Sequence, residues 1–176
     1  DESKREYTPV QTQPSVAQAA MIGNPVSMPR VIRIAREYDA ASGHRNVFVV
    51  QVKEQQIMDW QLTANQNGHI ACTQGGECLA GMIQAKQLNL VDESETVILD
   101  ATAHAIKFSG FQDMYFKGEL SEVYGISSDS GFINLPDFVS PDDPQLIPSQ
   151  EKPLEASLFQ KFVTDVSEKI ATRLGL

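Results

Sequence analysis

The chain has 176 residues, enough for one domain with a sizeable hydrophobic core. Its formal net charge of -9 and its isoelectric point near 4.7 exclude the basic face that nucleic-acid binding requires. The longest apolar runs, such as residues 47–50, are far too short to span a membrane. Composition therefore indicates a soluble globular protein that binds neither nucleic acid nor a membrane.

The first residue and the cysteines bear on the cellular setting. The sequence begins with Asp1 rather than Met, which indicates processing or an excised segment, and its polar start leads us to expect no signal peptide. Cys72 and Cys78 are too few for a usual disulfide framework. We therefore expect a cytoplasmic protein.

A polar lead-in and two helices are expected first. The lead-in covers residues 1–14. Ser15 is a suitable N-cap for a helix of small residues that stops at Gly23. Ser27 caps the next helix, whose apolar residues recur on one face and which Gly43 ends.

The middle of the chain alternates between β-rich runs and helical patterns. Strands are expected at residues 46–52, 69–73 and 96–102, and helices between them at residues 53–68 and 75–90. This order, with short joints that contain glycine, predicts an α/β fold. We expect a three-layer arrangement around a parallel sheet over residues 15–120.

The alternating pattern stops after Phe108. Residues 121–153 are rich in Pro, Ser and Asp, which predicts an extended segment. Residues 154–176 form an amphipathic helix in which every fourth residue is apolar, from Leu154 to Leu174. Such a stripe is typical of core or interface packing.

A parallel sheet usually binds ligands beyond the carboxyl ends of its strands. Cys72 and Thr73 follow one predicted strand, and Thr102 and His104 end another. Thr102 could instead cap a helix, and Asp100 could cap or bond a loop. From the residues alone we infer a ligand edge, and its chemistry stays open.

A metal site is not expected. The candidate ligands are His44, His69, His104, Cys72 and Cys78. His69 and Cys72 lie three apart on a predicted strand, so their side chains point to opposite faces. Neither C-x-x-C nor H-x-x-x-H spacing occurs.

The joint "TQGGE", residues 73–77, and the cysteine before it suggest two further kinds of site, a phosphate site and a nucleophile. Glycines at the start of a helix can receive a phosphate, but no Walker or G-x-G-x-x-G pattern is present. Close packing is the simpler interpretation of Gly75 and Gly76. Cys72 could be a nucleophile, but the sequence supplies no base for it, so an inert core cysteine is favoured.

Three stretches together resemble the threonine synthase family. "VILDATAHAIKF" (97–108) is similar to the family's C-terminal motif of an apolar strand followed by T-(G/A)-H-(G/A)-hydrophobic-K. "AQAAMIGNPVSMPRV" (17–31) resembles its I-G-N-P-V stretch, with Met28 where Trp is common. "GHIACTQGGECLAGM" (68–82) resembles the small-residue strand and helix between them. The resemblance covers about residues 10–120.

This resemblance implies a fold type II enzyme that uses pyridoxal 5'-phosphate to convert O-phospho-L-homoserine and water to L-threonine and phosphate. It implies that the Thr102 hydroxyl bonds the cofactor's pyridine nitrogen, a role suited to a group that both donates and accepts. Cys72 and Thr73 would lie beside the ring, and Gly23 close to its face. His104 and Lys107 would support the loop rather than perform chemistry.

The sequence also departs from the family. None of its eight lysines stands in a (T/S)-F-K-D motif, where the family's Schiff-base lysine lies. The loop that grips the cofactor phosphate is missing too. We therefore expect the C-terminal portion of a threonine synthase, inactive alone, whose partner is the missing N-terminal portion.

Other interpretations stay open. The chain could belong to a paralogue, such as a cysteate synthase or a threonine dehydratase. It could instead be a non-catalytic module that binds a metabolite or a protein. If the N-terminal portion is missing, exposed apolar surface should make the isolated chain prone to form homodimers.

Overall fold

The computed structural model describes residues 7–149 and 152–176. The chain divides between Leu135 and Pro136 into two compact units. Unit 1 ends at Leu135 and unit 2 runs from Pro136 to Leu176, so the division falls inside the stretch expected to be extended.

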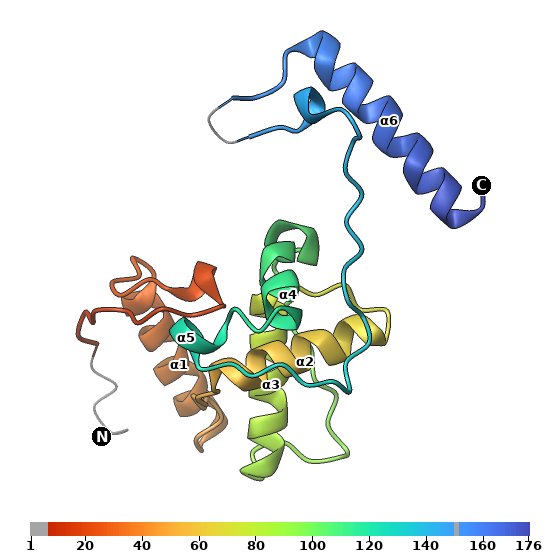
Figure 1. Ribbon diagram of the computed structural model, residues 1–176. Coiled ribbons are helices and arrows are strands. Elements are labelled where there is room, and N and C mark those ends of the chain that lie inside the picture. The colour runs from red at the N-terminus through yellow and green to blue at the C-terminus, as the bar shows by residue number, and fades with distance from the viewer. Residues whose placement is uncertain (1–6, 150–151) are drawn as a thin grey trace. The chain divides into compact units, whose positions relative to one another are not determined.

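Unit 1 is helical (Figure 1). Its elements, in chain order, are η1 (Gln18–Ala20), α1 (Met28–Ser42), α2 (Glu54–Gln66), α3 (Thr73–Gln87), η2 (Ala105–Phe108), α4 (Ser109–Phe116) and α5 (Ser121–Tyr124). The η elements are short 3-10 helices.

Helix α1 follows its sequence signals closely. Pro29 lies in the first turn, where a missing backbone N–H costs nothing. Gly43 adopts the left-handed conformation (φ 72°) that ends the helix, as expected. The expected helix from Ser15 is wrong in extent, because only the 3-10 turn η1 forms there. Val16 and Ala17, just before η1, are instead buried in the core.

The hydrophobic core of unit 1 lies between α2, α4 and the segment that precedes η1. Its buried members are Val16, Ala17, Ile57, Met58, Leu62, Phe111, Tyr115, Leu120 and Ile126. The Tyr115 hydroxyl is held from two sides, since it donates to Asp59 Oδ1 (3.3 Å) and accepts from the Asp129 amide (2.9 Å). Burial, above all, raises the pKa of Tyr115 to about 12.

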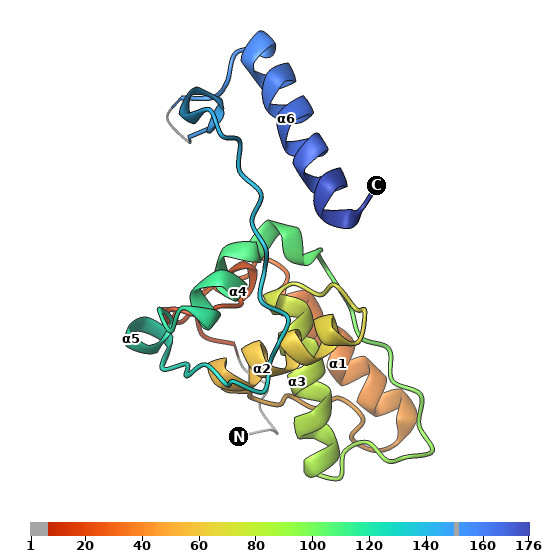
Figure 2. The ribbon, with the colours of Figure 1, turned by 45° about the vertical axis from the view of Figure 1, so that its right-hand side comes forward.

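Helices α2 and α3 pack closely against each other (Figure 2). A Cβ atom at Gly76 would collide with the Ile57 carbonyl oxygen and lie 2.7 Å from Gln61 Cβ. Only glycine therefore allows the two backbones to approach this closely. The packing interpretation of Gly76 is confirmed.

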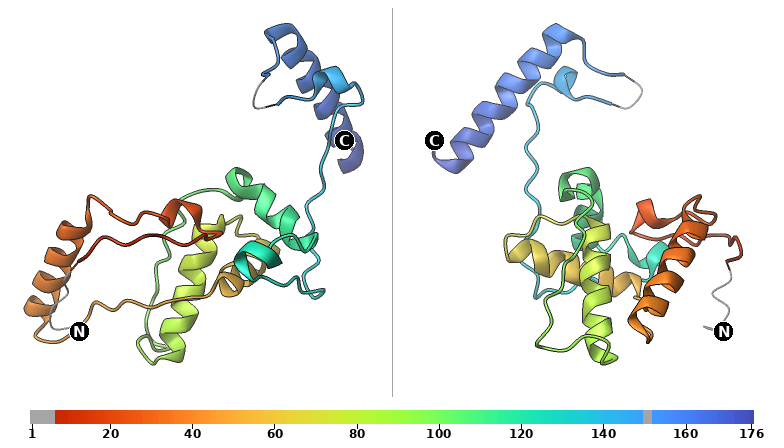
Figure 3. Two further views of the ribbon diagram at one scale, coloured as in Figure 1. Left: turned by 60° about the vertical axis from the view of Figure 1, so that its left-hand side comes forward. Right: turned by 180° about the vertical axis from the view of Figure 1, so that it is seen from behind.

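The expected α/β fold is wrong. Within residues 7–149 and 152–176 there is no β-strand and no sheet, so the parallel sheet and its three layers are absent from this part of the chain. Residues 46–52 and 96–101 run as extended chain (Figure 3). One isolated β-bridge joins Ala71 and His104, and it is antiparallel.

The physical reason lies in what a β-rich run requires. β-branched and apolar residues fit a pleated, half-buried surface, but they form a strand only where a neighbouring chain pairs with their backbone. Residues 46–52 and 96–101 form no strand in the described part of the chain, and Thr73, from the expected strand at residues 69–73, is instead the first residue of α3. The three expected strands are therefore wrong, because a β-rich pattern does not supply the neighbour that a strand needs.

Unit 2 contains residues 136–149, which we call the strap, and a long helix. The strap contains η3 (Pro144–Leu146), which packs against α6 (Ala156–Leu174). Lys169 ties strap to helix, because its ammonium group lies 2.7 Å from Asp142 Oδ1 and donates to the Ser140 carbonyl (2.8 Å). Arg173 forms a further ion pair with Asp137.

Candidate functional site

Three segments of unit 1 meet at the start of α3. Ala71, just before the helix, bridges to His104, and the Ala105 amide donates to the Ile70 carbonyl (3.3 Å). From the other side, η1 packs on α3. With its amide oxygen turned toward η1, the Gln74 side chain accepts from the Ala19 amide (3.0 Å). The segments that carry Cys72, Thr73 and Thr102 therefore meet here, while Gly23 lies three residues beyond η1.

Cys72 and Thr73 lie inside this junction. Both are fully buried, Cys72 as the residue before α3 and Thr73 as its first residue. The Thr73 hydroxyl lies 3.4 Å from the side-chain amide of Gln74, which is itself buried. These two side chains therefore lie in the interior of the junction, away from solvent.

Thr102 has the opposite environment, because it is exposed on the segment that leads to His104. Two contacts hold this segment: the bridge at His104, and a bond from the Cys78 thiol to the Asp100 carbonyl (3.5 Å). The Thr102 hydroxyl lies between these two fixed points. It is therefore presented to solvent by a restrained backbone.

His104 caps the short helix η2. Its Nδ1 atom accepts from the Ile106 amide (3.2 Å) and so caps η2. A cap at this position could be expected from sequence, but Thr102 was the candidate, since histidine is not among the favoured capping residues. Lys107 is exposed within η2.

Gly23 lies in the N-terminal segment, three residues after η1. Its carbonyl accepts from the Val10 amide (2.9 Å), and a Cβ atom at this position would collide with the Val10 carbonyl oxygen. Glycine is needed here for the close passage of two backbone segments. The structure thus gives Gly23 a packing role against Val10.

Two buried glutamines were not singled out from sequence. Gln74 links α3 to η1, as described above. Gln61, on α2, is 1% exposed and donates to the Ala71 carbonyl (3.1 Å), while its Oε1 atom finds no hydrogen-bond partner among the described residues. Polar residues in a helical pattern are usually assigned to solvent, so only the structure identifies these two as supports of the junction.

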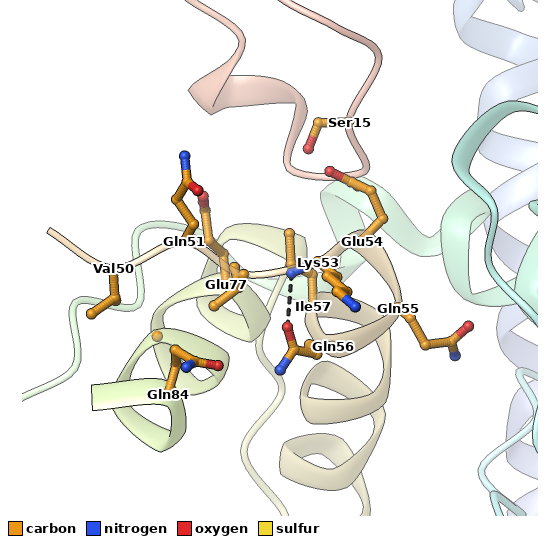
Figure 4. Close-up of a pocket in the computed structure, with 12 residues that line it drawn as sticks. Ser15, Val50, Gln51, Lys53, Glu54, Gln55, Gln56, Ile57, Glu77 and Gln84 are labelled. Atoms are coloured by element: carbon orange, nitrogen blue, oxygen red, sulfur yellow. Dashed lines mark hydrogen bonds between the residues drawn. The ribbon is translucent and has the colours of Figure 1, made fainter. Parts of the chain in front are cut away.

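A groove of about 990 Å³ opens beside the junction, between the start of α2 and one face of α3 (Figure 4). It is lined by Ser15, the chain from Val50 to Ile57, Glu77, Gly81 and Gln84. Glu54 accepts from the Val16 amide (2.8 Å) and thereby ties the N-terminal segment to α2. Figure 4 shows the Lys53 amide donating to the Gln56 side chain (2.8 Å), which fixes the first turn of α2.

The charges in this groove are mainly acidic. Burial, and then the nearby Glu54 carboxylate, raise the pKa of Glu77. Burial also raises the pKa of the Cys78 thiol, with Glu77 and Asp100 adding to the effect. Cys78 therefore stays a thiol near neutral pH, and the groove disfavours anions such as phosphate.

In residues 7–149 and 152–176, no group of three or more His, Cys, Asp or Glu side chains is placed to hold a metal ion. Among the helices in the same ranges, none is both long enough and apolar enough to cross a membrane.

Comparison with known proteins gives a similarity to an enzyme of threonine synthesis. No protein-family model matches the chain, and no solved structure matches it. The chain is 22% identical over 120 residues to threonine synthase 2, chloroplastic, from Arabidopsis thaliana. The match covers 68% of this chain and 22% of that protein, so the chain spans about a fifth of the relative's length. The chain is therefore distantly related to a threonine synthase.

Proposed function

We propose that this chain is the C-terminal part of a pyridoxal-phosphate-dependent threonine synthase, which converts O-phospho-L-homoserine and water to L-threonine and phosphate. In this proposal the chain supplies one wall of the active site and the N-terminal portion of the enzyme supplies the rest. The chain alone is inactive.

Two observations support the proposal. The similarity to a threonine synthase extends over 120 residues, and three motifs of the family occur in the family's order. The contact that carries most weight is the bridge between Ala71 and His104. It brings the end of one motif, with Thr102, next to the start of another, with Cys72 and Thr73, although about thirty residues separate them in sequence.

The residues of this chain suit contacts to one edge of the cofactor ring. They do not include the lysine that would anchor the cofactor covalently. The exposed Thr102 hydroxyl can donate to or accept from a ring nitrogen, and the contacts around it hold its backbone in place. The chain has no lysine in the family's anchoring motif, and the groove beside the junction is acidic. The anchor and the phosphate contacts belong, in this proposal, to the N-terminal portion.

When bound, the cofactor supplies the electron sink for bond changes at the amino acid's carbons. Thr102 would position the ring by holding its nitrogen without imposing a full charge on it. Cys72 and Thr73 are buried, so their side chains would not touch the ring. They would instead hold in place the backbone that faces it. Gly23 would keep the N-terminal segment close to Val10.

The test uses the gene product as the native source makes it, purified through a C-terminal tag. We expect a protein much longer than this chain that forms threonine and phosphate from O-phospho-L-homoserine. Replacing Thr102 by Val should lower kcat about tenfold, because one hydrogen bond of roughly 1–1.5 kcal/mol is lost. Thr102→Ser keeps the hydroxyl and is the matched control.

Three results would contradict the proposal. Turnover of O-phosphoserine or of threonine, with none of O-phospho-L-homoserine, would indicate a cysteate synthase or a threonine dehydratase. A native product of about 19 kDa without activity would indicate a non-catalytic module. Equal kinetics for Thr102→Val and wild type would remove Thr102 from the site.

A further inference from the structure

Two extended segments of unit 1 expose apolar side chains to solvent. In the first, Phe48 is 41% and Val49 88% exposed. In the second, Ile98 is 91% exposed, and its neighbours Val97 and Leu99 are exposed to about 40%. Single exposed apolar residues are ordinary on protein surfaces, but runs of them in extended chain indicate a surface that another polypeptide covers.

The first segment contacts α3 through Val50, and the chain of the second contacts the same side of α3 through Asp100, the residue that follows Leu99. The position of a Cβ atom on Gly81 is 3.7 Å from Val50 Cγ2, and the Cys78 thiol bonds the Asp100 carbonyl. Cys78 and Gly81 are three residues apart in one helix and therefore neighbours on its surface. We call residues 46–52, residues 97–99 and this side of α3 the α3 face.

The acidic groove continues the α3 face. Val50 and Val52 line it from the first segment, and Glu77 and Gly81 line it from α3. Glu54 and Glu77 face the same space, with Lys53 at its edge. The surface to be covered thus combines apolar strips with a groove that favours a cationic side chain.

A second copy of the chain does not suit this surface. Each copy carries a formal net charge of -9, and a symmetric dimer through the α3 face would bring two acidic grooves together. The length of the relative points to a different partner. This chain corresponds to about a fifth of that threonine synthase, so most of the enzyme has no counterpart in it.

We propose that the N-terminal portion of the enzyme docks on the α3 face and covers residues 46–52 and 97–99. This proposal rests on the proposed function, because it takes its partner from there. The docked portion buries the exposed side chains Val49 and Ile98, and it places a Lys or Arg over the groove beside Glu77. In the complete enzyme the α3 face is an internal surface.

Photo-crosslinking in the complete gene product tests this. The photoreactive residue p-benzoylphenylalanine replaces Val49 in one variant and Ile98 in another, and mass spectrometry locates the crosslinks. Val123 on α5, which is 60% exposed and belongs to neither segment, is the matched control position. We expect crosslinks to the N-terminal portion from positions 49 and 98, at least tenfold more than from position 123.

Other patterns of crosslinks overturn the proposal. These are crosslinks confined to this chain, crosslinks to a second copy, or equal yields at all three positions. Threonine formation by the unmodified enzyme is measured separately, so failure of the proposed function is recognised on its own. An active threonine synthase with no crosslinks from positions 49 and 98 would overturn the docking surface alone.

Discussion

Ala71 and His104 form an isolated antiparallel bridge that joins the chain before α3 to the chain before η2. The Ala105 amide, which donates to the Ile70 carbonyl, strengthens the same contact. Because η1 packs on α3 as well, the start of α3 contacts the segment that carries Thr102 on one side and η1 on the other. The geometry of the candidate site therefore depends on how firmly α3 is fixed.

Gly76 is the residue on which the position of α3 depends most. We expect Gly76→Ala to lower the free energy of unfolding by about 1–3 kcal/mol, because the added methyl group collides with the Ile57 carbonyl. Urea unfolding followed by circular dichroism measures the change. Gly110→Ala, in α4, is the control: its methyl group meets nothing within 4 Å, so stability should be unchanged or higher. Equal losses in the two variants would contradict this account.

Gln55 links α2 to the chain at Ser127 through two hydrogen bonds. Its amide group donates to the Ser127 carbonyl (2.9 Å) and accepts from the Ser127 amide (2.8 Å). Gln55→Ala removes both bonds and should cost about 1–2 kcal/mol of stability. Hydrogen exchange at the Ser127 amide should become faster, while Gln66→Ala, at the exposed end of α2, should leave it unchanged. Unaltered exchange in Gln55→Ala would show that other contacts hold the segment.

Glu77 makes stability depend on pH. Its pKa is raised from the ordinary value of 4.5, so the folded state binds the proton more tightly than the unfolded state does. This contribution to stability is fully present below pH 4.5 and is lost as the pH rises through the raised pKa of the folded state. Glu77→Gln should therefore raise Tm relative to wild type at pH 7.

The comparison across pH is the decisive measurement for Glu77. The difference in Tm between Glu77→Gln and wild type should shrink as the pH falls toward 4.5. Glu122→Gln, at an exposed position on the short helix α5, is the control. A difference that is constant with pH would exclude ionisation of Glu77 as its cause.

Lys169 organises unit 2. Its ammonium group contacts Asp142 and the Ser140 carbonyl in the strap and Asp165 on its own helix, and the Asp142 contact raises the pKa of Lys169 above its ordinary value. Lys169→Met should loosen the strap and speed hydrogen exchange in α6. Lys161→Met, at an exposed position of the same helix, should not. The effect should weaken at high salt, because the contacts are exposed to solvent.

The sequence predicted where helices begin and end better than it predicted what they pack against. Pro29 and Gly43 mark the ends of α1 because each acts through its own backbone geometry. Residues 46–52 and 96–101 were expected to be strands and are not, because a strand also needs a neighbour's backbone, which no local pattern can supply. The same limit explains Gln61 and Gln74, whose burial depends on where α2, α3 and η1 meet.

The candidate site was predictable only in part. The motif around Thr102 identifies a segment, but its exposure and its contact with the start of α3 are tertiary properties. Cys72 and Thr73 were expected at the ring's edge and are fully buried, so a role for them passes through the backbone. Gly23 was expected to lie close to a ligand. In the structure a glycine is needed there because a Cβ atom would collide with the Val10 carbonyl oxygen.

The position of the boundary between the two units has a consequence for the gene. Every residue of the hydrophobic cluster in unit 1, and every side chain packed around it, precedes Leu135; the last of them is Phe132. An early stop codon, a proteolytic cut or a gene fusion at that boundary would remove none of them. A chain that ends at Leu135 would therefore still contain the whole hydrophobic cluster of unit 1.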